Sequence, residues 1–147
     1  MRDRQASASC RRRSGEIGDG VTRSNQGSAP KQSLAVTALP SSVEGVLVLR
    51  VVGEIDLVTF RRLREQVHKY LRSDYRGLVL DFTGVSFLAG CGIGVLIEIA
   101  DQARTEGIAL RLVAHSRVVL RALEVSRANQ QICRASTVAE AVAQCAA

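Results

Sequence analysis

The sequence predicts one α/β domain, built on a largely parallel sheet flanked by helices, behind a disordered basic tail. Its 147 residues leave room for a single domain and a tail. From Ser33 onward, short apolar runs typical of strands alternate with segments of helical periodicity. Residues 1–32 show neither pattern and are rich in Ser, Arg and Gly. We therefore expect residues 1–32 to be disordered and the domain to span residues 33–147.

The net charge of +6 is concentrated in the predicted tail. Residues 1–32 contain seven basic and three acidic side chains, so the other 13 basic and 11 acidic residues leave the domain near +2. The chain has no Trp, two Tyr and three Phe, too few for aromatic platforms that stack on bases. Nucleic acid is therefore expected as a partner only through the tail, where Arg11-Arg12-Arg13 lies.

Neither a metal nor a cofactor is expected. The four cysteines and two histidines show no metal-ligand spacing: Cys10, Cys91, Cys133, Cys145, His68 and His115. The N-terminus has no apolar segment typical of a signal peptide, and no stretch approaches the ~20 apolar residues of a membrane span. These patterns predict a cytoplasmic protein that does not enter a membrane, with its cysteines mostly free.

The first half of the domain reads as two strands, a helix and a third strand. Residues 34–39 and 45–52 are apolar runs separated by a Pro-Ser-Ser turn. Asp56 is expected to cap a helix through Leu71, because apolar residues recur there at helical spacing. Residues 77–82 are apolar almost throughout, as in a central strand covered on both faces, and we expect a loop over residues 83–90.

The second half continues the alternation of helices and strands. A helix is expected over residues 91–106 with Gly107 ending it, followed by a strand over residues 108–114. Ser116 is placed to cap a third helix through about Val125. After a short extended piece at 131–134, Thr137 and Glu140 form the capping box of a last helix.

The most unusual segment is Phe87-Leu88-Ala89-Gly90-Cys91-Gly92-Ile93-Gly94, at the expected start of the second helix. It is not a dinucleotide-binding loop, because the third glycine of GxGxxG would fall on Val95, and no Walker lysine follows. Cys91 has three open interpretations: a packing residue, a redox-sensitive switch, or a nucleophile that would need a base. Only His68 and His115 could serve as that base, and neither lies in a recognisable constellation.

Three segments in order resemble a known family. They are Gly53-Glu54-Ile55-Asp56, Leu80-Asp81-Phe82-Thr83-Gly84-Val85-Ser86-Phe87-Leu88, and Leu110-Arg111-Leu112-Val113. This layout is similar to the STAS domain and, more narrowly, to the bacterial anti-sigma factor antagonists, over about residues 33–147. The resemblance implies a four- to five-stranded mixed sheet with about four helices, mainly on one side. It also implies a binding protein and not an enzyme.

The resemblance implies that the partner is an anti-sigma factor, a serine-kinase-like ATPase, and that binding it frees a sigma factor. The implied partner-binding residues are Glu54, Asp56, Leu88, Ala89, Gly90, Cys91 and Gly92. For Asp56 an ordinary helix-capping role is an equally open interpretation. In the family, phosphorylation of a Ser or Thr at this helix start ends binding, since added charge disrupts an interface.

The family pattern at this helix start is Asp-Ser-Ser/Thr-Gly, whereas this chain has Ala89-Gly90-Cys91-Gly92. The acceptor hydroxyls are absent, so we expect an antagonist without the usual Ser/Thr phosphorylation switch, and Cys91 becomes the switch candidate. Two alternatives from other classes stay open. One is a thiol-based redox-sensing protein centred on Cys91, and the other is a nucleic-acid-associated protein that acts through its tail.

Overall fold

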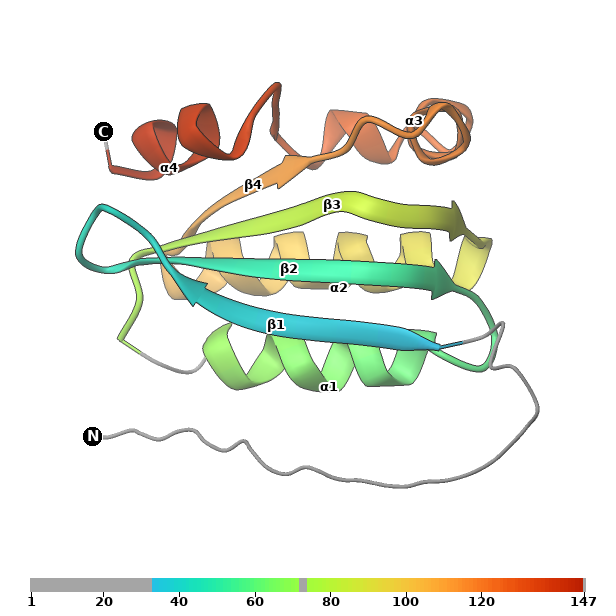
Figure 1. The fold of residues 1–147 in the computed structure, drawn as a ribbon, viewed down its shortest axis with the longest axis horizontal. Coiled ribbons are helices and arrows are strands. Elements are labelled where there is room, and N and C mark those ends of the chain that lie inside the picture. Colours follow the sequence, from blue (N-terminus) through green and yellow to red (C-terminus); the bar gives the residue numbers. More distant parts are fainter. Residues whose placement is uncertain (1–32, 72–73, 147) are drawn as a thin grey trace. The chain divides into compact units, whose positions relative to one another are not determined.

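Within the residues that the structure describes, the fold is a five-stranded mixed sheet with four α-helices, as the resemblance to the STAS domain implied (Figure 1). The structure, a computed structural model, describes residues 33–71 and 74–146. The predicted disorder of residues 1–32 lies outside the described residues, so it and the domain boundary at residue 33 stay predictions. The elements are β1 Leu34–Pro40, β2 Val46–Ile55, α1 Phe60–Leu71, β3 Gly77–Leu88, α2 Gly90–Glu106, β4 Ala109–Val113, α3 Arg117–Val125, η1 Ala128–Gln130, β5 Arg134–Ala135 and α4 Val138–Ala146.

The strands lie in chain order across the sheet, β1-β2-β3-β4-β5. The β1–β2 pair is antiparallel, and the three later pairs are parallel. Each parallel pair is joined by one of α1, α2 and α3. Because such crossovers are right-handed and the strand order never reverses, all three helices cover the same face. The helices α1 and α2 run side by side there (Figure 1), where Arg64 of α1 pairs with Glu98 of α2 at 3.3 Å.

Two hydrophobic cores follow from this arrangement. The larger core lies between the sheet and α1, α2 and α3, and includes Leu49, Leu80, Leu112, Leu63, Ile99 and Leu123. The smaller core lies on the other face, where Ala141, Val142 and Cys145 of α4 pack against strand residues whose side chains point to that face, including Val48 and Val79. Residues 77–82 are buried throughout, which confirms the central strand covered on both faces.

One expected loop is a strand. The predicted loop over residues 83–90 is wrong, because β3 continues through Leu88 beside a β2 that itself extends to Ile55. Local turn residues such as Thr83 and Gly84 suggested a loop, but pairing with β2 keeps this segment extended. Two register irregularities between β2 and β3 accommodate it.

The helix ends show which local signals were correct. Gly107 has a left-handed backbone, φ 72°, and the amides of Gly107 and Ile108 bond back to Arg104 and Ala103, as predicted for a terminating glycine. Ser116 does occupy the N-cap position of α3, but its side chain makes no capping hydrogen bond. The last strand, β5, is shifted to Arg134–Ala135 from the expected piece at 131–134.

Candidate functional site

The residues singled out from the sequence meet at the carboxyl ends of β2 and β3. In the parallel register Glu54 lies beside Phe87 and Ile55 beside Leu88. The amide of Ala89 donates to the carbonyl of Ile55 at 2.9 Å, which ties the start of α2 to the end of β2. The structure thus brings Glu54 and Asp56 next to the segment 88–92. Their role in partner binding stays a prediction.

Asp56 organises the turn into α1. Its carboxylate accepts hydrogen bonds from the amides of Val58 and Thr59, at 2.9 and 3.1 Å. In return, the Thr59 hydroxyl accepts from the Asp56 amide and donates to the Glu54 carbonyl, at 2.9 and 2.6 Å. These bonds support the capping interpretation of Asp56. The half-buried Glu54 differs, because its carboxylate has no hydrogen bond or ion pair within residues 33–71 and 74–146.

Residues 92 and 90 are glycines for different structural reasons. A Cβ on Gly92 would overlap the side chain of Ile55 and lie 2.7 Å from Leu88 Cδ1, so only glycine lets α2 sit this close to the strand ends. A Cβ on Gly90 would meet nothing within 4 Å. Gly92 therefore serves packing, whereas Gly90 leaves an open backbone at the surface of the helix start.

An exposed apolar surface adjoins this helix start. Leu57 and Val58, in the turn before α1, are 79% and 65% exposed, and Phe87 at the end of β3 is 44% exposed. Scattered apolar residues are ordinary on a surface, but these three flank the same strand ends. The sequence did not single out any of the three as a partner-binding residue. The available signal was two aliphatic residues in a row, Leu57-Val58, directly after a capping aspartate.

Cys91 is half-buried and carries a free thiol, which has no hydrogen-bond partner among the described residues. The histidines are engaged elsewhere: His68 lies 3.3 Å from Glu98, and His115 donates to the Ser136 carbonyl at 2.7 Å. Neither therefore forms a thiol–imidazole pair with Cys91 of the kind that a cysteine nucleophile uses. Within the described ranges, no group of His, Cys, Asp and Glu could hold a metal.

The other described cysteines are too far from Cys91 for a disulfide. Cys145 packs on Gly77, at the opposite end of β3 from Leu88. Eleven residues of strand separate the two ends, about 36 Å at ~3.3 Å per residue, whereas disulfide-linked Cα atoms lie within about 7 Å. The Cys133 carbonyl accepts from Leu112, which pairs with Leu80, about 26 Å along β3 from Leu88 by the same rise. An intramolecular bridge from Cys91 to either is excluded.

The hydroxyls upstream of the helix start are held on the strand. Thr83 Oγ1 donates to Asp81 at 2.7 Å, and Ser86 Oγ lies 3.5 Å from the Gly53 carbonyl. Asp81 is buried, accepts the Thr83 amide and pairs with Arg50 at 3.5 Å. It lies in the middle of β3, where it satisfies a backbone amide, a hydroxyl and an arginine.

These observations define a small α/β domain with an open helix start beside an exposed apolar surface. Residues 40–144 match the STAS domain family, and the chain belongs to that family. None of its described helices is long and apolar enough to cross a membrane.

The named relatives agree with this assignment. The chain is 28% identical over 91 residues to "Anti-sigma-F factor antagonist RsfB" of Mycobacterium tuberculosis, covering 62% of this chain and 74% of that protein. A crystal structure of an anti-sigma factor antagonist from Mycobacterium paratuberculosis superposes with a TM-score of 0.72 at 24% identity, covering 82% of this chain and 99% of that one. The anti-sigma factor antagonist SpoIIAA, in its unphosphorylated form, gives a TM-score of 0.62 at 18% identity, with 75% and 95% covered. Both structures show the likeness of the fold alone.

Proposed function

We propose that this protein is a cytoplasmic anti-sigma factor antagonist. It binds an anti-sigma factor of the serine-kinase-like ATPase class and thereby frees the sigma factor. The contact surface is the start of α2 with the adjoining strand ends, comprising Glu54, Asp56, Leu88, Ala89, Gly90, Cys91 and Gly92. The relative from Mycobacterium tuberculosis, named as an antagonist of an anti-sigma factor, supports this proposal.

One observation carries the proposal: the open helix start and the exposed apolar side chains lie at the same strand ends of a STAS domain. Leu57, Val58 and Phe87 supply apolar area, and aromatic residues are enriched at the centres of protein interfaces. Gly90 allows a partner to approach the backbone closely. The unpaired carboxylate of Glu54 provides a charge that a basic partner group can satisfy.

The proposed antagonist lacks the usual phosphorylation switch. Gly90 and Cys91 stand where the family pattern has hydroxyl side chains, and a thiol is not a normal acceptor for a serine kinase. Thr83 and Ser86 lie in β3 and do not take over these positions. Binding is therefore either constitutive or governed by chemistry at Cys91.

The decisive experiment places a negative charge on the helix start without disturbing the fold. Gly90→Glu adds a carboxylate where a Cβ meets no atom, and an acidic residue in a first turn is mildly stabilising. We expect it to weaken binding at least about tenfold, or ~1.4 kcal/mol. The matched control is Ala139→Glu, which adds the same charge to the exposed first turn of α4. Binding is measured by calorimetry against purified anti-sigma factors of this ATPase class from the same organism.

Two outcomes would contradict the proposal: none of these anti-sigma factors binds the wild type, or Gly90→Glu binds as tightly as Ala139→Glu does. Phosphorylation is tested separately by incubation with the binding anti-sigma factor and ATP, followed by mass spectrometry. We expect no phosphate on residues 83–94 of the wild type. The double variant Gly90→Ser/Cys91→Ser, which restores the hydroxyls, should be phosphorylated. Phosphate on the wild-type segment would refute the loss of the switch.

A further inference from the structure

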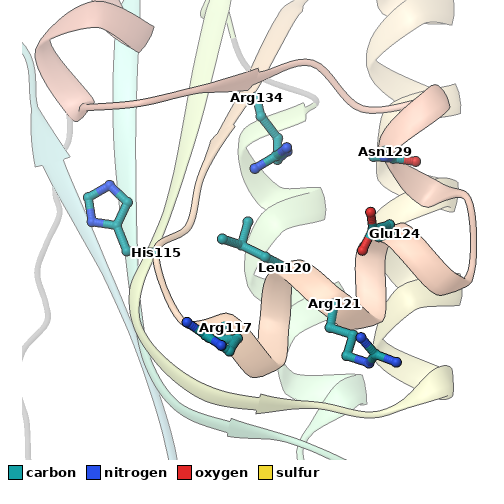
Figure 2. Close-up of a pocket in the computed structure, with 7 residues that line it drawn as sticks. All are labelled: His115, Arg117, Leu120, Arg121, Glu124, Asn129 and Arg134. Atoms are coloured by element: carbon teal, nitrogen blue, oxygen red, sulfur yellow. The ribbon is translucent and has the colours of Figure 1, made fainter.

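A hollow in the surface lies between α3 and β5, away from the helix start of α2. Its volume is about 550 Å³, within the range of small-molecule sites, roughly 300–1,000 Å³. Arg117, Leu120 and Arg121 line it from α3, and His115 and Arg134 line it from the segments on either side (Figure 2). Arg134 extends toward Leu120, so residues distant in the sequence share one hollow (Figure 2).

The hollow is strongly basic. Three arginines and one acidic residue, Glu124, line it, and none of these arginines is paired with a carboxylate within the described part of the chain. Three other arginines of the domain do have such partners: Arg50 with Asp81, Arg64 with Glu98 and Arg104 with Asp101. Gathering like charges without partners costs free energy, and an anion bound among them would remove that cost.

The position of the hollow also favours an anion. One end of it, at His115 and Arg117, lies where β4 ends and α3 begins. Ser116, the N-cap of α3, makes no side-chain capping bond, so the first amides of α3 are left without a side-chain acceptor. Arg117 and Arg121 are one helical turn apart and therefore lie on the same side of α3.

The remaining lining residues suit a ligand larger than a bare ion. His115 Nε2 donates to the Ser136 carbonyl, which fixes the ring and leaves Nδ1 unbonded within the described residues. Leu120 contributes apolar surface, and Asn129 offers an amide that both donates and accepts. Guanidinium groups bind phosphate oxygens in a bidentate manner, which makes arginine the usual residue for this task.

We propose that this hollow binds a phosphate-bearing small molecule, with Arg117 and Arg134 holding the phosphate and Arg121 adding charge. The site is separate from the helix start of α2, and it stands whether or not the protein is an anti-sigma factor antagonist. Inorganic pyrophosphate and inorganic phosphate serve as the probes of phosphate recognition, which all candidate ligands share. Ribose 5-phosphate and ADP then separate a sugar phosphate from a nucleotide as the source.

The test is calorimetry on the full chain. We expect saturable binding of at least one probe below about 10 mM, with pyrophosphate tighter than phosphate. Arg117→Gln and Arg134→Gln should each raise Kd at least about threefold, and the double variant at least about tenfold. Arg61→Gln is the matched control, because this exposed arginine lies on α1, which packs near β1 and β2 at the other edge of the sheet. Its Kd should equal that of the wild type.

NMR amide shifts locate the bound probe. We expect them at His115, Arg117, Leu120 and Arg134. Three results would overturn the proposal: no saturable binding of any probe up to about 10 mM, equal weakening in Arg61→Gln, or shifts confined to residues 1–32. The last result would assign anion binding to the basic tail. Circular dichroism of each variant confirms that the fold is retained.

Discussion

The starts of α2 and α4 differ in how their backbone amides are satisfied. At α4 the Thr137 hydroxyl accepts from the Glu140 amide at 3.0 Å, and the Glu140 carboxylate accepts from the Ser136 amide at 2.9 Å. At α2 the N-cap is Ala89, which has no side-chain acceptor, and no acidic residue occupies the first turn. One helix start is completed by its own side chains, and the other leaves its donors to a partner or to water.

The start of α2 is stabilised by tertiary packing and not by a capping side chain. Gly92 lets the helix approach Ile55 and Leu88, and the Ala89 amide bonds to the end of β2. Further along, one side of α2 is buried in the main core, and Gly107 closes the far end. The first backbone amides of α2, at the proposed contact surface, can therefore stay without acceptors, because tertiary contacts supply most of the stability of a helix.

The largest expected effect comes from the packing that replaces the cap. Gly92→Ala forces a methyl group into Ile55 and Leu88, so we expect it to destabilise the domain by about 1–3 kcal/mol. Gly94→Ala is the control on the same helix, where a Cβ meets nothing, and it should gain about 0.5–1 kcal/mol. Urea denaturation measures both. If the two variants lose equal stability, close packing is not the reason that position 92 requires glycine.

Next in size is the loss of the α4 cap. Thr137→Ala removes the acceptor of the Glu140 amide and should cost about 1 kcal/mol of unfolding free energy. Partner binding should not change, because α4 packs on the other face of the sheet from α2. Denaturation and calorimetry on the same sample separate the two effects. A loss of binding in the folded variant would contradict the assignment of α4 to a structural role.

The converse change adds a cap to α2. Ala89 has the extended backbone of an N-cap, φ −83° and ψ 168°, so Ala89→Asp should accept amide bonds and gain about 0.5–1 kcal/mol of stability. The substitution restores the acidic residue that the family pattern has at this position, so we expect partner binding to stay within about threefold of the wild type. A gain in stability with binding retained would sharpen the contrast between the helix starts. A variant with no gain in stability would remove it.

The last expected effect concerns Cys91 and partner binding alone. Mild oxidation adds polarity or bulk beside Gly90 and should weaken partner binding about three- to tenfold, or ~0.7–1.4 kcal/mol. Because a bridge to Cys133 or Cys145 is excluded, the product is a sulfenate, a mixed disulfide with an added thiol, or a bridge to Cys10, which lies outside the described residues. Cys91→Ala should keep reduced-state binding and abolish the sensitivity. Equal wild-type affinities with and without oxidant, measured by calorimetry, would leave Cys91 as a packing residue.

Periodicity predicted most of the fold, because apolar spacing at 3.6 and 2 residues reflects burial directly. It failed at residues 83–88, where Thr83 and Gly84 look like a turn but lie within β3, which pairs with β2 again from Gly84 onward. A single sequence does not show which strand will pair with residues 83–88 and keep them extended. Ser116 illustrates the same limit, since the residue type predicts a cap while the rotamer actually adopted makes no capping bond.

For the candidate site, the resemblance to the STAS domain implied Glu54, Asp56 and the segment 88–92, and the structure brings these residues together at the strand ends. Their role in binding stays a prediction. Phe87 lies beside this segment, but its exposure depends on the packing of the sheet and was not predictable. The basic hollow was missed for a related reason: Arg117 and Arg134 are 17 positions apart and meet only once α3 and β5 have packed.

The two edges of the sheet carry different risks of self-association. β5 has two residues and offers almost no template, whereas β1 is a seven-residue edge strand, LAVTALP, without a single charge. Uncharged edge strands are where a second chain adds by backbone pairing, and natural proteins guard them with charge or proline. Pro40 guards one end. At the other end β1 is preceded in the sequence by residues 1–32, whose net charge of +4 adds to the like charge that opposes association of two copies.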